Sequence, residues 1–213
     1  MSEFIHVYEL RCRRCMGELA GMPTDKVFTC AACNVAFFPS DGALNAVPLH
    51  WALAPDENVV PMYLPFWKMD VDVSVTAPNG NPVTRETAAR NISAVWVAAF
   101  YENRPSYFGN PGLNLTIVRA APSVAAARPP SAEVKGIIRS VDDAKRYATL
   151  FVTQILDKEK DVTGYGIDVS FRAAALWAMP FEYREAEDIL VDLISGSTYQ
   201  SAVVQYFKEM IMR

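Results

Sequence analysis

The four cysteines of this chain form two short pairs near the N-terminus, and this pattern constrains the fold more than any other feature. Cys12 and Cys15 make the first pair, Cys30 and Cys33 make the second, and residues 16–29 lie between them. Two residues separate the cysteines of each pair, a spacing that lets both thiolates bind one cation. The sequence therefore predicts a metal site with these four ligands, which folds the N-terminal segment around it.

Zinc is the predicted ion, at one per chain, because four thiolates close its tetrahedral coordination shell. A closed site has no position for water or substrate, so the zinc would be structural. It would contribute on the order of 10 kcal/mol to a segment whose core is too small to fold alone. Iron in a rubredoxin-like site is the competing interpretation. Two disulfides are the other alternative, which a reducing compartment disfavours.

Strand-forming residues flank both cysteine pairs. The predicted strands are residues 3–11, 27–29 and 35–38, with a turn at 21–25. Gly17 and Asn34 lie just past the two pairs, where a positive φ would help the chain to turn. The expected order is therefore strand, knuckle, hairpin, knuckle and strand.

With this cysteine spacing, residues 8–38 resemble a zinc ribbon, a module of many bacterial and archaeal proteins and of transcription factors. Met16 and Asn34 stand where ribbons commonly carry a glycine directly after each pair. Together with the Leu-Pro-Phe-Trp segment at residues 64–67, the ribbon is similar to that of a group of uncharacterised bacterial zinc-ribbon proteins. The resemblance implies a zinc site and no particular activity.

Composition favours a folded chain and disfavours several functional classes. Hydrophobic residues make up 51% and charged residues 21% of the 213 residues, so global disorder is not expected. The net charge of −4 argues against a dedicated nucleic-acid binder, which needs clustered Lys and Arg. There is no apolar run of roughly 18 residues to span a membrane, and residues 1–10 do not form a secretory signal. The expected location is the cytoplasm.

The predicted architecture is a zinc ribbon over residues 1–40 followed by an α+β domain over residues 41–213. The sheet of this domain is expected to be mainly antiparallel. Its predicted strands are residues 68–75, 92–101, 113–119, 167–182 and 189–194. One helix is predicted from Ser140, with a capping box and a continuous apolar stripe, and another over residues 199–212. Both helices are expected to cover one face of the sheet.

A short phrase of apolar and aromatic residues recurs at residues 62–67, 95–102 and 176–183. Each copy contains Pro or Ala followed by Phe, which indicates similar strands. Pro65 and Pro180 occur in two of the copies, and a strand proline favours a sheet edge or a bulge.

Candidate catalytic groups are few. His6 and His50 are the only histidines, and neither has a neighbouring nucleophile motif. His50 is interpreted as a packing residue beside Trp51. Asp70 and Asp72 could form a carboxylate pair, but their alternation with valines places them on the solvent face of a strand. No catalytic or cofactor-binding residue is predicted.

The predicted function is a non-enzymatic zinc-binding adaptor or scaffold that acts through protein–protein contacts, with a protein partner or a second copy of the chain. Any exposed aromatic residues around Trp67 and Tyr107 would belong to this interface. One alternative is a nucleic-acid-associated regulator that uses Arg11, Arg13 and Arg14 at the first knuckle. The second alternative is an enzyme whose site is not visible in the sequence.

Overall fold

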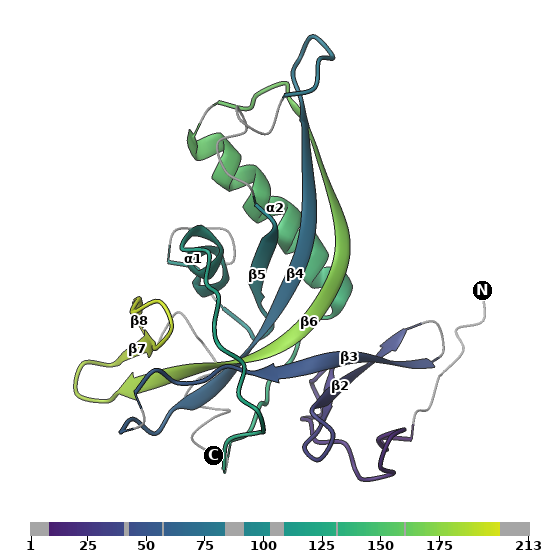
Figure 1. Ribbon diagram of the computed structural model, residues 1–213, viewed down its shortest axis with the longest axis vertical. Coiled ribbons are helices and arrows are strands. Elements are labelled where there is room, and N and C mark those ends of the chain that lie inside the picture. Colours follow the sequence, from purple (N-terminus) through teal and green to yellow (C-terminus); the bar gives the residue numbers. More distant parts are fainter. Residues whose placement is uncertain are drawn as a thin grey trace.

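The computed structural model describes residues 9–40, 43–56, 58–83, 92–102, 109–130, 132–159 and 161–200. Its elements are β1 (Phe28–Cys30), β2 (Val35–Ser40), β3 (Ala43–Trp51), β4 (Met62–Thr76), β5 (Ala94–Ala98), α1 (Pro111–Ile117), α2 (Val141–Glu159), β6 (Gly166–Arg184), β7 (Ile189–Asp192) and β8 (Thr198–Gln200). They form an α+β fold in which a mixed sheet packs with two helices (Figure 1). Within the described ranges, no helix combines the length and the apolar character that crossing a membrane requires.

Two long strands, β4 and β6, form the centre of the sheet. They pair antiparallel from Met62 opposite Phe181 to Thr76 opposite Gly166. The strand order is β1-β2-β3-β6-β4-β5, and β7 and β8 extend the sheet from β6. β3 and β6 run parallel over three residue pairs, while the other described pairs are antiparallel. The expectation of a mainly antiparallel sheet is therefore refined to a mixed one.

The alternation predicted for residues 68–75 is present in β4. Met69, Val71 and Val75 are buried, while Asp70 and Asp72 are partly exposed. The pairing with β6 shifts register between Asp70 and Val71, as at a β-bulge. This strand is therefore amphipathic beyond Met69, while residues 63–67 are buried on both faces of the sheet.

The three copies of the recurring phrase lie on or beside neighbouring strands. The Phe66 ring meets the Phe100 ring edge-on at 5.4 Å between centroids and stacks on Phe181 at 5.9 Å. Pro65 and Pro180 lie in inner strands, at points where pairing on one side stops. β6 pairs with β3 before Pro180 and with β7 after it. Because proline has no N–H to donate, it fits this change of partner.

The strand predicted over residues 113–119 is wrong, because residues 111–117 form helix α1. Asn110 is its N-cap, with Oδ1 accepting a hydrogen bond from the Leu113 N–H at 3.0 Å. Pro111 occupies the first turn, where its missing N–H has no cost. The Asn-Pro sequence was the helix-start signal, and the short alternation of apolar residues after it was misleading.

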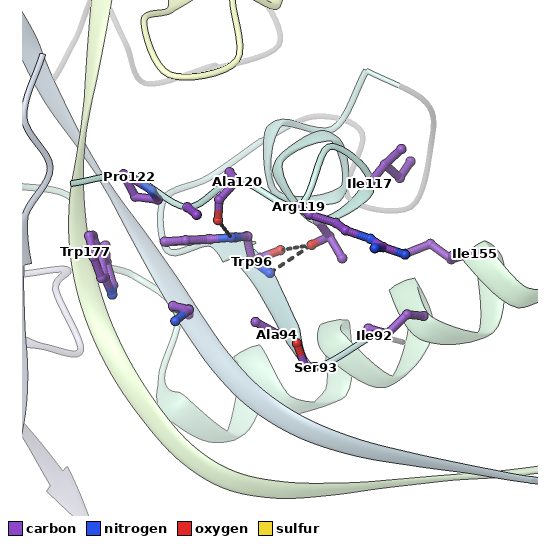
Figure 2. Close-up of a pocket in the computed structure, with 13 residues that line it drawn as sticks. Ile92, Ser93, Ala94, Trp96, Ile117, Arg119, Ala120, Pro122, Ile155 and Trp177 are labelled. Carbon is purple, nitrogen blue, oxygen red and sulfur yellow. Dashed lines mark hydrogen bonds between the residues drawn. The ribbon is translucent and has the colours of Figure 1, made fainter. Parts of the chain in front are cut away.

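Helix α1 closes the open edge of β5. The Trp96 N–H donates to Thr116 Oγ1 at 2.8 Å, which replaces a bond to another strand. A Cβ at Gly112 would lie 2.7 Å from the Trp96 carbonyl oxygen, so this close approach requires glycine. Figure 2 shows Trp96 on β5 beside the chain that leaves α1. The edge is thereby protected from pairing with another chain.

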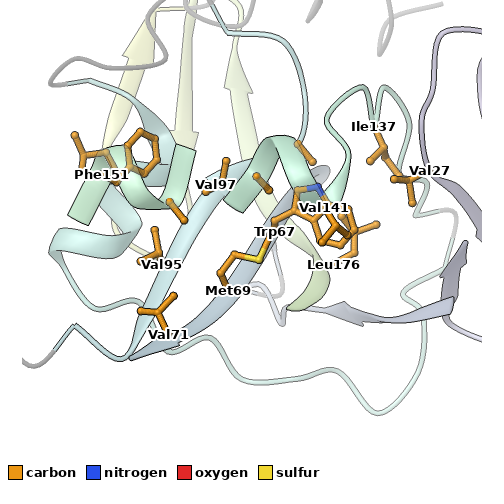
Figure 3. Packing of buried hydrophobic residues seen from close by; sticks show 14 of the residues in the cluster. Val27, Trp67, Met69, Val71, Val95, Val97, Ile137, Val141, Phe151 and Leu176 are labelled. Atoms are coloured by element: carbon orange, nitrogen blue, oxygen red, sulfur yellow. The ribbon is translucent and has the colours of Figure 1, made fainter. Parts of the chain in front are cut away.

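Helix α2 covers one face of the sheet, and its predicted start is confirmed. Ser140 Oγ accepts from the Asp143 N–H, and Asp143 Oδ2 accepts from the Ser140 N–H, both at 3.1 Å. Its stripe packs on the sheet (Figure 3), where the core residues include Trp67, Met69, Val71, Val95, Val97, Phe151 and Leu176. Trp67 itself is not available to a partner surface. It is 0% exposed because α2 covers this face, and its Nε1–H donates to the Arg139 carbonyl at 2.9 Å.

A buried ion pair connects the end of β5 to the segment before α2. Arg139 Nη1 lies 2.8 Å from Glu102 Oε1, and their side chains are 9% and 0% exposed. The same nitrogen donates to the Ala98 carbonyl at 2.7 Å, and the guanidinium lies over the Tyr147 ring at 4.5 Å. Burial raises the pKa of Glu102 above its usual value, and the charge of Arg139 opposes this effect.

The helix predicted over residues 199–212 is wrong at its start, because Tyr199 and Gln200 belong to β8, and its other residues lie outside the described part of the chain. Asp192 Oδ1 accepts from the Ile194 N–H at 2.9 Å, and Oδ2 accepts from Ser195 Oγ at 2.5 Å. This buried carboxylate organises the turn that directs residues 198–200 back onto β7. The described residues therefore contain α1 and α2, and α1 takes the place of the second helix that the sequence predicted.

Candidate metal centre

The four cysteines that the sequence singles out come together in space. Sγ atoms of Cys12, Cys15, Cys30 and Cys33 all lie within 4.8 Å of one another, and those of Cys15 and Cys30 are 3.6 Å apart. A tetrahedral zinc site with bonds of about 2.3 Å has sulfurs about 3.8 Å apart. All four are free thiols, which excludes the disulfide alternative in this structure. The donor set fits a thiophilic metal ion, and a small contraction would complete the tetrahedron.

Each pair turns in the same way. Directly after the pairs, Met16 has φ of 61° and Asn34 has φ of 50°, so both are left-handed. The Met16 N–H donates to the Cys12 carbonyl at 2.8 Å, and the Asn34 N–H to the Cys30 carbonyl at 3.1 Å. The prediction is right for Asn34, but Met16 takes the position expected of Gly17. Asparagine tolerates this conformation, whereas methionine is strained by roughly 1 kcal/mol.

Two hairpins support the thiols. β1 pairs with β2 from Phe28 opposite Phe37 to Cys30 opposite Val35, and Arg11 bridges Glu18 beside the first pair. A small cluster surrounds the two buried cysteines, formed by Cys12, Leu19, Cys30, Val35, Phe37 and Leu44. The strands expected at residues 27–29 and 35–38 are thus present, and most of the one expected at 3–11 lies outside the described residues. A core this small needs further stabilisation, which a bound metal ion would supply.

The electrostatics of the thiols favour binding of a cation. Burial raises the pKa of Cys12, but hydrogen bonds from the backbone N–H groups of Cys15 and Arg14 outweigh it and lower this pKa to about 6. Hydrogen bonding with the Cys15 thiol, and then burial, raise the pKa of Cys33 to about 12. The Cys12 thiolate therefore forms readily, whereas the raised pKa values of Cys30 and Cys33 make those two thiols harder to ionise. A bound cation would allow all four to ionise together.

Within the described residues, Lys26, Asn34 and strand β3 attach the N-terminal segment to the rest of the fold. The Lys26 N–H donates to the Ile137 carbonyl at 2.8 Å, and its ammonium lies 2.9 Å from Asp143 Oδ2. Trp51 Nε1–H donates to Asn34 Oδ1 at 3.1 Å. β3 pairs with β2 and, further along, with β6. The predicted boundary at residue 40 thus coincides with a continuous run of paired strands.

The Lys26–Asp143 contact predicts an acid-sensitive component of stability. Burial opposes ionisation of Asp143, but hydrogen bonds from Lys26 and Ser140 prevail and lower its pKa to about 2, below the usual 3.8. The carboxylate therefore stabilises the fold above about pH 4, and this contribution of about 1–2 kcal/mol is lost as pH falls towards 2. Asp143→Asn should remove it, measured as the change in urea midpoint between pH 5 and pH 2.

The control for this measurement is Asp142→Asn. Asp142 is the neighbouring carboxylate, 72% exposed and paired with Lys145 at 3.1 Å. Its replacement should leave the acid dependence close to that of the unmodified chain. If the urea midpoints of the two variants changed equally between pH 5 and pH 2, the assignment of this component to Asp143 would be contradicted.

Other residues singled out by the sequence do not converge on a site. His50 packs on the Trp177 ring at 4.9 Å between centroids, as its interpretation as a packing residue requires. Asp70 and Asp72 lie in surface ion pairs with Lys68 at 3.5 Å and Arg172 at 3.2 Å. His6 and Tyr107 lie outside the described residues.

Sequence reasoning missed a cavity of about 340 Å³, lined by residues of β4, β5, α2 and β6 and by the chain around the end of α1. Lys68, Trp96, Arg119 and Trp177 are among its lining residues. They are far apart in the sequence and match no motif. The unusual concentration of tryptophans in the recurring phrase was the one available signal.

The chain has no match among protein-family models, curated proteins or solved structures.

Proposed function

We propose that this chain is a non-enzymatic zinc-binding adaptor whose N-terminal module is a zinc ribbon. The observation that carries the proposal is the convergence of four free thiols within 4.8 Å. A four-thiolate site is coordinatively closed, so its role would be to rigidify the two knuckles. A reducing compartment such as the cytoplasm would keep the thiols available.

Four tetrahedral thiolates suit zinc or iron, and zinc is favoured here for the short spacing between the two cysteine pairs. Elemental analysis of the purified chain should give about one zinc per chain and no iron. Stoichiometric iron, with the visible absorption of an iron–thiolate centre, would support the rubredoxin-like alternative. A chain without either metal would overturn the metal assignment.

The surface proposed to contact a partner is the first knuckle. Arg13 and Arg14 are exposed and have no ion pair within the described residues, whereas Arg11 pairs with Glu9 at 2.8 Å. Met16 is 62% exposed in its strained conformation. An acidic protein surface with an apolar contact for Met16 would complement this combination.

Charge reversal tests the adaptor proposal against the nucleic-acid alternative. Affinity capture from the native host compares three tagged chains: the unmodified chain, the knuckle variant Arg13→Glu/Arg14→Glu and the control Lys145→Glu/Arg146→Glu. The control reverses an adjacent basic pair on α2. We expect the same set of proteins to bind the unmodified chain and the control, and not to bind the knuckle variant. Random duplex DNA at low salt should bind none of them. Salt-dependent DNA binding that the knuckle variant loses would favour the regulator instead.

A further inference from the structure

The cavity missed by the sequence has walls of two kinds. Trp96 and Trp177 form an aromatic side, with ring centroids 5.5 Å apart and planes at 77°. Lys68 and Arg119 contribute two cations, and no Asp or Glu is among the described lining residues. Lys68 lies directly opposite Trp96 on β4 and β5, so the cation and the ring share a face of the sheet. Figure 2 shows Arg119 across the cavity from Trp177.

Trp177 has a buried hydrogen-bond donor that no group of the described residues satisfies. The chain has four tryptophans, and three donate Nε1–H: Trp51 to Asn34 Oδ1 at 3.1 Å, Trp67 to the Arg139 carbonyl at 2.9 Å and Trp96 to the Ala120 carbonyl at 3.2 Å. Trp177 Nε1 is buried without a partner, although its ring lines the cavity. A buried unsatisfied donor is costly, so contacts of the Trp177 ring with His50 and Trp96, and no hydrogen bond, hold this side chain at the cavity wall.

Arg119 is held in a conformation that favours glycine. Its φ is 54°, and it follows α1 at the position where helices often end in a left-handed glycine. The Arg119 N–H donates to the Thr116 carbonyl at 3.1 Å and the Ala120 N–H to the Leu115 carbonyl at 2.9 Å, as in a Schellman motif. Arg119 makes no ion pair with the described residues. The two hydrogen bonds of this motif stabilise the left-handed backbone and hold Arg119 at the wall of the cavity.

We propose that this cavity binds a small organic anion with an aromatic or planar body. The tryptophan rings would contact the body, Arg119 would contact the anionic group, and Lys68 would add a second positive charge. The volume of about 340 Å³ is at the lower end for small-molecule sites and suits a compact ligand. Asp70 pairs with Lys68 at 3.5 Å and partly offsets its charge, so Arg119 is the principal anion contact. This site is independent of the four thiols.

The test uses 2-naphthoate and its neutral amide as matched probes, titrated into the full zinc-loaded chain by calorimetry. We expect 2-naphthoate to bind at least about tenfold more tightly than the amide, because charge-assisted hydrogen bonds exceed neutral ones. In a ¹H–¹⁵N spectrum, the indole signal of Trp177 should shift, while those of Trp51 and Trp67 should not. Equal binding of the two probes, no binding of either, or a shift confined to Trp51 and Trp67 would overturn the proposal.

Two variants and a control complete the test. Arg119→Gly should weaken 2-naphthoate binding at least about tenfold while raising Tm by about 2–4 °C, because glycine relieves the left-handed backbone. Lys68→Gln should also weaken binding, and it gives a second result should the glycine variant fold poorly. Lys145→Gln is the control. It removes one positive charge from α2, ten residues before Ile155 of the cavity lining, and should bind 2-naphthoate with unchanged affinity. Unchanged affinity in both pocket variants would refute the site without affecting the zinc proposal.

Discussion

Replacement of Cys12 by serine is expected to abolish stoichiometric zinc binding and to unfold the N-terminal hairpins. Cys12 is fully buried in the small cluster around the thiols. Serine supplies no thiolate. Mutation of residues that only support a metal ligand weakens metal binding roughly 10–100-fold, so the loss of a direct ligand should weaken zinc binding by more than that. Zinc content and competition with a chromophoric chelator measure the loss. Hydrogen exchange across β1 and β2 should rise to that of an unfolded segment, because a segment with so small a core is expected to fold only with its metal.

The matched control is Ala31→Ser, which adds a hydroxyl to the exposed second knuckle and keeps all four thiols. It should bind one zinc with nearly unchanged affinity and protect β1 and β2 as before. If Cys12→Ser also retained one tightly bound zinc, the four-cysteine assignment would be wrong. If Cys12→Ser lost zinc but β1 and β2 stayed fully protected from hydrogen exchange, metal binding would not be what folds the hairpins.

Replacement of Arg139 by methionine is expected to lower the free energy of unfolding by about 3–5 kcal/mol, because it leaves Glu102 buried without its cation. The Ala98 carbonyl also loses its 2.7 Å donor. Urea unfolding at pH 7 measures the loss. Without the opposing charge, the pKa of Glu102 should rise further, so the deficit should shrink as pH falls and the carboxyl becomes neutral. The double variant Arg139→Met/Glu102→Leu should recover much of the stability.

Arg172→Met is the control for this prediction. Arg172 pairs with Asp72 at 3.2 Å, but the side chains are 54% and 47% exposed. Solvent screening limits such a pair to about 1 kcal/mol or less. A loss in Arg139→Met no larger than that in Arg172→Met would show that water reaches Glu102.

Local and periodic patterns in the sequence were sufficient for much of the fold. The capping box at Ser140 and the alternation after Lys68 each depend on residues close in sequence, and the structure contains both elements. The cysteine spacing likewise predicted which four side chains come together. Each of these features is fixed by a turn, a helix period or a strand period.

Features that depend on distant segments could not be predicted. The alternation at residues 113–119 looked like a strand because seven residues are too few to separate the two periods, and the helix is selected by packing on β5. The burial of Trp67 depends on α2, which lies more than seventy residues away. The cavity draws its lining from several elements, so spacing gave no sign of it. The family resemblance of residues 8–38 stays a prediction.

The pairing of β2 with β3 has a consequence for chains cut at the predicted boundary. A chain beginning at residue 41 would retain β3 but lose the strand that pairs with it from Ala43 to Pro48. The N–H and C=O groups of that stretch would become a free edge, ready to pair with another molecule. Such a truncated domain should self-associate by pairing of these free edges. In the longer chain, β2 of the cysteine-bearing hairpin pairs with this edge and prevents such aggregation.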